Sequence, residues 1–321
     1  MGDRRTRKCL VMSSQPSSRS QASNRPTVAF IGAGRAANVI GIALAKAGYD
    51  IVAVASRTRE SADATAAAIV AAGAVNCRSM DPQAAADAAD LLLITTSDGA
   101  IGEVGSSLRW RPGQTVAHCS GALGADVLAP AQAQGAAIGS WHPFQTLAGT
   151  AELDGVTFGI EAGPDLYETL ADLARAVGGF PLAVPAEARA LYHAASVLAC
   201  GYLTTLLREA RRIWEAAGLP EEAGRLAIGA VASATLANVR AMGEGATVTG
   251  PVSRGDMGTV QLHLESIRAA APDLLPLYTA ISRRSAVLAL DAGRPTKSLE
   301  EWDALYGQFG EHGAFSEETG G

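Results

Sequence analysis

The pattern of hydrophobic and polar residues between Thr27 and Val184 alternates short apolar runs with alanine-rich segments of helical spacing. The apolar runs predict strands at Val28–Ile31, Ile51–Ala55, Leu91–Ile94, Thr115–His118, Ala136–Ser140, Phe158–Ile160 and Phe180–Val184. Helices are predicted at Arg35–Ala47 and Arg59–Ala72, and another begins near Asp165. Continuous apolar strands that alternate with helices indicate a parallel sheet covered by helices on both faces.

From Glu187 onward the pattern is helical, with almost no strand signal. The predicted segments are a helix at Glu187–Ala217, a helix with Pro220 just inside its start, a loop at Gly243–Gly255, and helices at Asp256–Ala270 and Asp273–Leu290. The fold class that follows is α/β, with an N-terminal doubly wound parallel sheet of the Rossmann type and a C-terminal all-helical domain.

This pattern divides the chain into four parts. We predict a disordered basic tail at 1–26, a Rossmann domain at 27–185, a helical substrate and dimerisation domain at 186–295, and a C-terminal helix and tail at 296–321. The apolar stretch of the tail, Cys9–Met12, is shorter than the about 7–15 residues of a signal-peptide core. The tail is interpreted as a disordered extension or a start assigned too far upstream, with Met12 as one alternative start. A basic targeting arm is the other alternative.

The composition fits a folded protein of two domains. The 321 residues are 48% hydrophobic and 18% charged, which argues against global disorder. The net charge of −6 gives no overall basic field to attract nucleic acid or an anionic membrane. We therefore expect a small-molecule substrate rather than a nucleic-acid or membrane partner.

The cysteines and the longest apolar runs indicate a cytoplasmic protein. The four cysteines are scattered without CxxC spacing, so neither a metal site nor a disulfide framework is expected. No uninterrupted apolar run reaches the about 18 residues that span a bilayer. The longest candidates, near Ala194–Leu207 and Ala227–Ala237, are expected to be buried helices.

A glycine-rich turn follows the first predicted strand. Residues 28–37 read VAFIGAGRAA, a strand that leads into GxGxxA at the mouth of a helix. Gly32 permits a tight turn, Gly34 lets the backbone approach a pyrophosphate, and Ala37 keeps the helix close to the sheet. With Arg35 and Ala36, these residues are the predicted dinucleotide site; the alternative is an ordinary turn.

The end of the second predicted strand indicates which dinucleotide binds. An NAD site usually has an acidic residue there, bonded to the ribose 2′-hydroxyl, but this chain has Ser56, Arg57, Thr58 and Arg59. Hydroxyl and guanidinium groups suit a 2′-phosphate, so the cofactor predicted is NADP(H). The alternative is that Ser56 or Thr58 caps the next helix and the arginines are solvated.

A polar loop follows the strand at Leu91–Ile94. In open α/β sheets, ligands bind beyond the carboxyl ends of the strands. The loop is therefore expected to line the ribose and nicotinamide side of the cofactor through Thr95, Thr96, Ser97 and Asp98. Its other interpretation is a helix cap made by Asp98.

The sequence resembles a family that joins a Rossmann-like domain, of the deazaflavin-dependent NADP oxidoreductase type, to a domain of unknown function numbered 2520. The residues that carry the resemblance are Gly32–Ala37, Asp98 with Ile101, His118–Ala122, Gly139–Gln145, Leu191–Ala195, Thr249–Asp256, Thr259 and His263. The resemblance covers about Thr27 to Leu290 and implies kinship with 6-phosphogluconate dehydrogenase, pyrroline-5-carboxylate reductase and ketopantoate reductase. Those relatives are typically dimers that pair through their helical domains. One departure is Gly201, where family members often carry Asn.

Three regions supply groups for hydride transfer to a carbonyl or an imine, which needs a proton donor and a substrate anchor. His118 and Ser120 lie at the end of one predicted strand. Ser120 is expected to bind a substrate carboxylate or the cofactor, or to cap the turn that follows it. His142 ends the next strand and is either a proton donor or a buried structural histidine. By analogy with the relatives, His193 is the first choice for the general acid, with Ser196 on the same helix face. The alternative is that His193 only packs between helices.

The GPVSRGD segment of the second domain is the remaining candidate. Arg254 is expected to pair with an anionic group of the substrate, and Asp256 to cap a helix or to form an ion pair with Arg254. Thr259 and His263 follow near the same helix face.

These candidates lead to one main hypothesis, an NADPH-dependent reductase of a small anionic carbonyl or imine compound. The donor would be His193 or His142, and a 2-keto acid or a pyrroline-carboxylate-like imine would suit the site equally. The alternative is a non-catalytic NADP(H)-binding sensor, and a deazaflavin partner is a third possibility.

Overall fold

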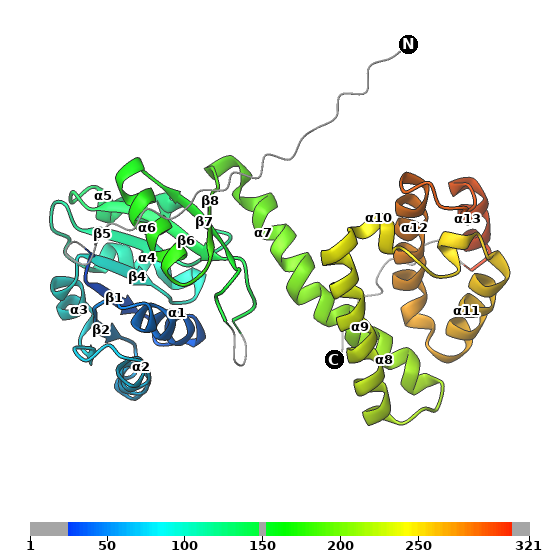
Figure 1. Ribbon diagram of the computed structural model, residues 1–321, viewed down its shortest axis with the longest axis horizontal. Coiled ribbons are helices and arrows are strands. Elements are labelled where there is room, and N and C mark those ends of the chain that lie inside the picture. The colour runs from blue at the N-terminus through cyan, green and yellow to red at the C-terminus, as the bar shows by residue number, and fades with distance from the viewer. Residues whose placement is uncertain (1–24, 148–151, 310–321) are drawn as a thin grey trace, which may run out of the picture. The chain divides into compact units, whose positions relative to one another are not determined.

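The computed structural model describes residues 25–147 and 152–309, and the chain divides into two compact units, Met1–Ser196 and Val197–Gly321 (Figure 1). The division falls inside the long predicted helix rather than near Pro185. Residues 1–24 of the predicted tail and residues 310–321 lie outside the described part.

The first unit contains an eight-stranded sheet in the order β3-β2-β1-β4-β5-β6-β7-β8. Its strands are β1 Val28–Ile31, β2 Ile51–Ala55, β3 Arg78–Ser79, β4 Leu91–Ile94, β5 Thr115–His118, β6 Ala137–Pro143, β7 Thr157–Ala162 and β8 Phe180–Ala183. Neighbouring strands are parallel except for β7, which runs antiparallel to β6. The predicted Rossmann-type sheet is confirmed, with this one reversal.

Helices cover both faces of the sheet, which explains the continuous apolar runs. They are α1 Arg35–Lys46, α2 Arg59–Ala71, α3 Pro82–Ala88, α4 Asp98–Ser107, α5 Ala129–Gln132 and α6 Pro164–Ala176. Alternate residues of β1 enter opposite cores: Phe30 packs with the cluster that holds Leu44 of α1, and Ile31 with the cluster that holds Ile101 of α4. A strand buried on both faces can contain no polar position, as the sequence pattern predicted.

The carboxyl ends of the central strands lie in register along one edge. Ile31 of β1 pairs with Ala55 of β2 and with Ile94 of β4, and Ile94 pairs with His118 of β5. His118 in turn pairs with Ser140 of β6. The loops that follow these strands therefore leave the sheet at the same edge, where the strand order changes direction between β1 and β4.

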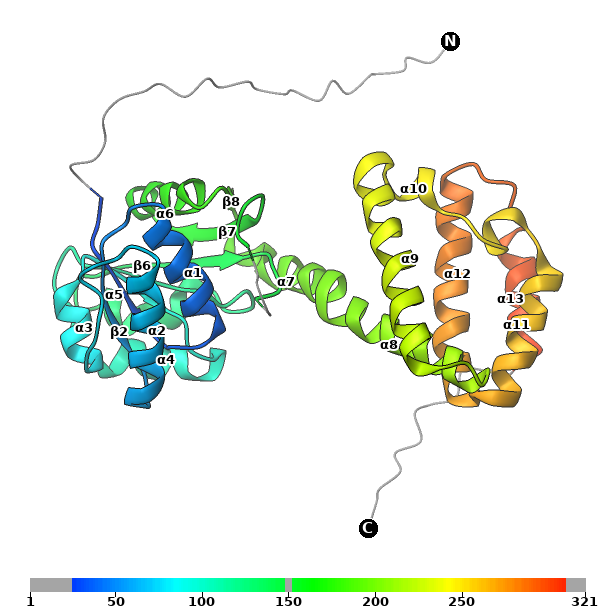
Figure 2. The same cartoon turned by 60° about the horizontal axis from the view of Figure 1, so that its bottom comes forward.

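The second unit is helical (Figure 2). Its helices are α8 Leu203–Ala216, α9 Glu221–Met242, α10 Glu244–Thr247, α11 Met257–Ala270, α12 Leu275–Asp291 and α13 Leu299–Gly307. Val260, Leu264, Ala286 and Trp302 form its main core. Two details correct the sequence-based expectation. Pro220 is the residue that precedes α9 rather than its first residue, and the expected loop at Gly243–Gly255 contains α10 and a 3₁₀ turn.

A continuous helix runs from Ala186 to Ala216. It consists of a 3₁₀ turn, α7 Arg189–Val197, a π-helical segment Leu198–Tyr202 that contains Gly201, and α8. By length and composition alone it could cross a membrane, since its most apolar window has a mean hydropathy of 1.4 and is not buried. The expectation that Ala194–Leu207 and Ala227–Ala237 are buried was wrong, because the structure leaves no residue of either segment buried. A helix of this kind is weak evidence for a membrane segment.

Candidate functional site

The glycine turn after β1 has the conformation that its sequence predicted. Gly32 has φ +112°, and a Cβ there would lie 2.6 Å from the backbone carbonyl carbon of Thr95. The Thr95 hydroxyl donates to the carbonyl oxygen of Gly32 at 2.9 Å, which ties the turn to the end of β4. Gly34 is the N-cap of α1 and faces open space, whereas Ala37 is fully buried. No side chain caps the first amides of α1, and such amides at a helix start suit a pyrophosphate.

The end of β2 presents one free cation beside this turn. Arg59 pairs with Asp63 at 3.2 Å, and the Thr58 hydroxyl donates to Ser61 rather than capping α2. Arg57 is exposed and forms no ion pair with any described residue. Of the two arginines predicted to bind a 2′-phosphate, Arg57 is therefore the one without an ion-pair partner among the described residues.

The loop after β4 follows the expected path, but its capping residue differs. Asp98 is the first residue of α4 and Ser97 is the N-cap, with no side-chain capping bond from either. The predicted cap by Asp98 was therefore wrong. Thr96 and Ser97 remain beside the turn, and Ser97 is exposed.

His118 is a buried structural histidine. Its Nδ1 accepts from the Ser120 amide at 3.2 Å, and its Nε2 lies 2.9 Å from the carbonyl oxygen of Gly124, which indicates that the proton is on Nε2. Burial lowers its pKa, and the nearby Arg189 guanidinium lowers it further. The Ser120 Oγ accepts hydrogen bonds from the amides of Ala122 and Leu123. Ser120 therefore caps this turn, which was one of the roles predicted for it.

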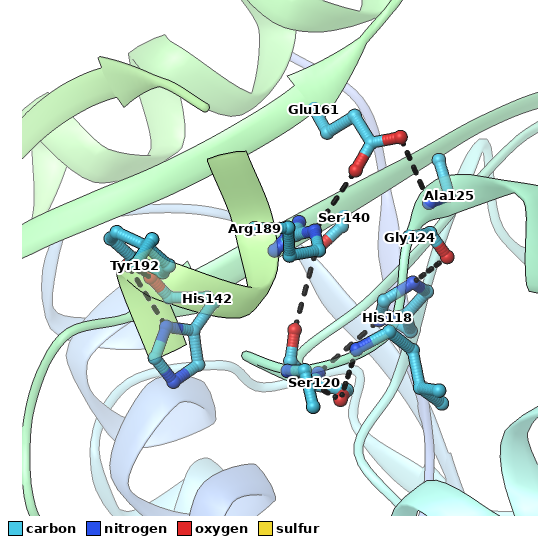
Figure 3. A network of polar contacts seen from close by, with 11 residues as sticks. His118, Ser120, Gly124, Ala125, Ser140, His142, Glu161, Arg189 and Tyr192 are labelled. Atoms are coloured by element: carbon cyan, nitrogen blue, oxygen red, sulfur yellow. Dashed lines mark hydrogen bonds and ion pairs between the residues drawn. The ribbon is translucent and has the colours of Figure 1, made fainter. Parts of the chain in front are cut away.

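His142 and Tyr192 lie side by side where β6 approaches α7 (Figure 3). His193 of α7 and Gly121 of the loop after β5 lie against His142 and complete the cluster. His142 Nδ1 is 2.9 Å from the Tyr192 hydroxyl, which also lies 3.4 Å from the His142 carbonyl oxygen. The rings of His142 and His193 are perpendicular, with centroids 6.0 Å apart. A Cβ on Gly121 would approach both imidazoles to within 2.6–2.7 Å, so only glycine fits there without displacing them.

Both hydrogen-bonded groups of this cluster are neutral near pH 7. Burial lowers the pKa of His142 to about 4, with smaller contributions from His193, Arg189 and His118. Burial also raises the pKa of the Tyr192 hydroxyl above its ordinary value. The pair can therefore donate and accept hydrogen bonds or pass a proton without holding a net charge.

Three polar residues of this region, Tyr192, Arg189 and Glu161, carry no sequence signal of their own. Tyr192 lies inside the Leu191–Ala195 motif, but only its neighbour His193 was singled out. Arg189 and Glu161 form a buried ion pair at 2.9 Å, and no local pattern marks either residue. Ser196, expected on the face of His193, donates instead to the His193 carbonyl oxygen.

The candidates of the second unit form a separate local arrangement. Arg254 is exposed at the end of a 3₁₀ turn and makes no ion pair with a described residue, so the structure does not show the Arg254–Asp256 pair. Asp256 caps α11 by accepting from the Thr259 amide at 3.0 Å and from the Thr259 hydroxyl at 2.7 Å, as predicted. His263 Nδ1 lies 2.7 Å from the Tyr278 hydroxyl.

Within the described residues, no group of three or more His, Cys, Asp or Glu side chains could hold a metal ion. The described cysteines are Cys77, Cys119 and Cys200, and all three are free.

Comparison with solved structures gives the same two-domain fold at low sequence identity. A Bacteroides fragilis protein described as a candidate NADP oxidoreductase is 23% identical with a TM-score of 0.66, and the match covers 82% of this chain and 98% of that one. A pyrroline-5-carboxylate reductase from Coxiella burnetii is 17% identical with a TM-score of 0.55, over 86% of this chain and 100% of the other. An imine reductase from Aspergillus terreus, solved with NADPH4, is 19% identical with a TM-score of 0.56, over 88% and 100%.

Family models match most of the chain in two consecutive blocks. A model described as a Rossmann-like domain matches residues 12–143, and a model described as a domain of unknown function (DUF2520) matches residues 156–285. No curated protein sequence is significantly similar to this chain. The two matches bear out the resemblance that the motifs predicted, to a Rossmann-like domain followed by a domain of unknown function 2520.

Proposed function

We propose that this protein is an NADP(H)-dependent oxidoreductase that reduces a small anionic imine or carbonyl compound. The observation that carries the proposal is the common edge of the sheet. The Gly32 turn, the Arg57 side of β2 and the loop after β5 all leave the sheet there, and Gly121 of the last loop lies against His142. The structural relatives include proteins named for NADP oxidoreduction, pyrroline-5-carboxylate reduction and imine reduction, which supports the same chemistry.

The residues at the turn suit NADP(H). Gly34 has no side chain to cap α1, so the amides at the start of this helix are free to bind a pyrophosphate. Arg57 is exposed and unpaired among the described residues, and no acidic residue occupies the end of β2. Thr95 holds the turn open from the other side. When bound, the cofactor supplies a hydride to the acceptor carbon of the substrate.

Arg57→Ala is expected to weaken NADPH binding by about 10- to 100-fold and to leave NADH binding nearly unchanged. The reason is the loss of one charge-assisted hydrogen bond to the 2′-phosphate, worth about 1.5–3 kcal/mol. Calorimetric titration with each cofactor measures the effect, and Arg59→Ala is the control because Arg59 already pairs with Asp63. Equal loss for both cofactors, or none, would contradict the assignment of Arg57.

We place the proton donor in the His142–Tyr192 pair rather than at His193 alone. Tyr192 remains protonated at neutral pH, because burial raises its pKa. Its hydroxyl can give a proton to the developing amine or alkoxide while His142 orients it through the 2.9 Å contact. The His193 ring lies perpendicular to the His142 ring, with centroids 6.0 Å apart, and would line the same part of the site.

The candidate anchor for an anionic group of the substrate stays Arg254, a residue of the helical unit. Arg254 is exposed and has no ion-pair partner among the described residues, so its guanidinium is free for bidentate pairing with a carboxylate.

NADPH oxidation against a panel of keto acids and cyclic imino acids would identify the acceptor. Tight cofactor binding without turnover across the panel would favour the sensor alternative, and saturable binding of a deazaflavin would change the cofactor assignment.

We further propose a cytoplasmic homodimer paired through α9. From Leu226 to Val239 this helix has no charged residue, and Gly224 is the only buried residue in its described length. Leu226, Val231 and Met242 are each more than half exposed. An apolar helix of this kind normally packs against another surface, and a second copy offers a matching one.

Val231→Lys is expected to convert a dimer into a monomer, because a buried charge at the centre of α9 would oppose pairing. Light scattering coupled to size-exclusion chromatography measures the mass, and Gln261→Lys at an exposed site on α11 is the control. A wild-type monomer would overturn the dimer. Recovery of the wild type only in detergent would point to a membrane instead.

A further inference from the structure

A buried ion pair connects the candidate site to the first turn of α7. The Arg189 side chain is 2% exposed and the Glu161 side chain 19% exposed, and Arg189 Nε donates to Glu161 Oε2 at 2.9 Å. Figure 3 shows the pair between β7 and the loop that carries Ser120. An ion pair this deep is costly to bury, so it calls for a function beyond stability.

Glu161 and Arg189 together join three segments. The second carboxylate oxygen, Glu161 Oε1, accepts from the amide of Ala125 at 3.2 Å, which holds the loop after β5. Glu161 itself lies on β7, paired with Ser140 of β6. Arg189 precedes Tyr192 and His193 on α7, so one carboxylate holds the loop, the sheet and the helix that bear the polar cluster.

The guanidinium is only partly neutralised. Its Nη1 and Nη2 are buried and have no hydrogen-bond partner among the described residues. Arginine does not lose its proton in proteins, so the positive charge stays close to the imidazoles. It lowers the pKa values of His118 and His142, whereas Glu161 raises that of His118.

We propose that the Arg189–Glu161 ion pair is the positioning element of this site, which fixes Tyr192 and His142 relative to the Ser120 loop for proton transfer. This inference rests on the proposed function, but the geometry of the pair can be tested without it. Arg189 and Glu161 act through the cluster and are not assigned to the substrate.

The histidine pKa values test whether the charges of the pair act on the imidazoles, and kcat/KM tests whether the pair positions them. Arg189→Met removes a cation and should raise the pKa of His118 and His142. Glu161→Gln keeps the shape but leaves the cation uncompensated, and should lower the pKa of His118. The other charged or titratable groups near these two histidines are Asp98, which affects His118, and His193 and Tyr192, which lie beside His142.

The experiment is a pH titration of the ¹⁵N-histidine-labelled full chain by NMR, with assignments from single histidine substitutions. Arg175→Met, which breaks an exposed ion pair with Asp172 on α6, is the matched control and should leave both values in place. Arg189→Lys keeps the charge and should restore the wild-type pKa of His142. If Arg189→Met fails to fold, a lowered His118 pKa in Glu161→Gln together with wild-type values in Arg189→Lys supports the proposal, and an unchanged His118 pKa in Glu161→Gln overturns it.

Opposite shifts of the His118 pKa in the two folded variants, with a loss of about 10- to 100-fold in kcat/KM for Arg189→Met, would support the proposal. Unchanged pKa values, or shifts in the same direction, would overturn it. Opposite shifts in a protein that never oxidises NADPH would contradict the proposed function and leave the electrostatic role of the pair standing.

Discussion

Replacing Tyr192 by Phe should lower kcat by about 10²- to 10⁴-fold, the usual contribution of a positioned general acid. The change removes only the hydroxyl that lies 2.9 Å from His142 Nδ1. The ring contacts with His142 and Phe144 remain, so the fold and the affinity for NADPH should not change. Steady-state kinetics together with calorimetric titration of the cofactor would separate the two effects.

Tyr278→Phe is the matched control for this experiment. Tyr278 makes the same kind of contact with His263, at 2.7 Å and with perpendicular rings, within the helical unit. It should lose a hydrogen bond of equal type without a comparable loss of kcat. Equal losses in the two variants would mean that such pairs only stabilise the fold.

The pH profile of the wild type tests the same assignment. Burial lowers the pKa of His142 to about 4 and raises that of Tyr192, so neither group changes its charge between about pH 6 and 9. The rate of the chemical step should be flat in this range. A histidine of ordinary pKa acting as the acid would make the rate fall about tenfold per pH unit above about 6.5. Such a fall would assign the proton to an imidazolium rather than to the Tyr192 hydroxyl.

Gly32→Ala should lower the free energy of unfolding by about 3 kcal/mol or more, because two costs add. The backbone at Gly32 has φ +112°, a conformation that residues other than glycine rarely adopt. The methyl group of alanine would also lie 2.6 Å from the backbone carbonyl carbon of Thr95. Neither the turn nor β4 can move far, since both are hydrogen-bonded into the sheet. Chemical denaturation monitored by circular dichroism would measure the loss.

Gly34→Ala is the informative comparison. Gly34 has φ −86° and open space around its Cβ position, so alanine should leave the stability unchanged. Its methyl group would stand where a pyrophosphate approaches α1, and NADPH affinity should fall sharply. If Gly34→Ala bound NADPH normally, the turn would not be the cofactor site.

The strands and the turn could be predicted because their signals are local. Val28–Ile31 and Leu91–Ile94 are uninterrupted apolar runs, and a strand covered on both faces has no other pattern. Gly32 and Gly34 are needed for the conformation of their own turn and for close approach to it, so the sequence marks them directly. The cap of α11 by Asp256 is also local, since it joins residues one turn apart.

Local signals were insufficient where more than one cap or start was chemically suitable. Asp98 and Ser97 are both good N-cap residues, and the structure begins α4 at Asp98. Pro220 suits either side of a helix start and lies just outside α9. The antiparallel direction of β7 was also not visible, because a short buried strand has the same apolar pattern in either direction.

What the sequence by itself determined is the order of seven of the eight strands, the helices α1, α2 and α6, the dinucleotide turn and the absence of an acidic residue at the end of β2. Only the tertiary structure decided that His142 lies against both Gly121 and Tyr192, because the three residues come from different elements. The low pKa of His142 and the Arg189–Glu161 pair depend on burial by those same elements. Periodicity records which side of an element faces a core, whereas a polar cluster depends on the register and packing that bring separate elements together.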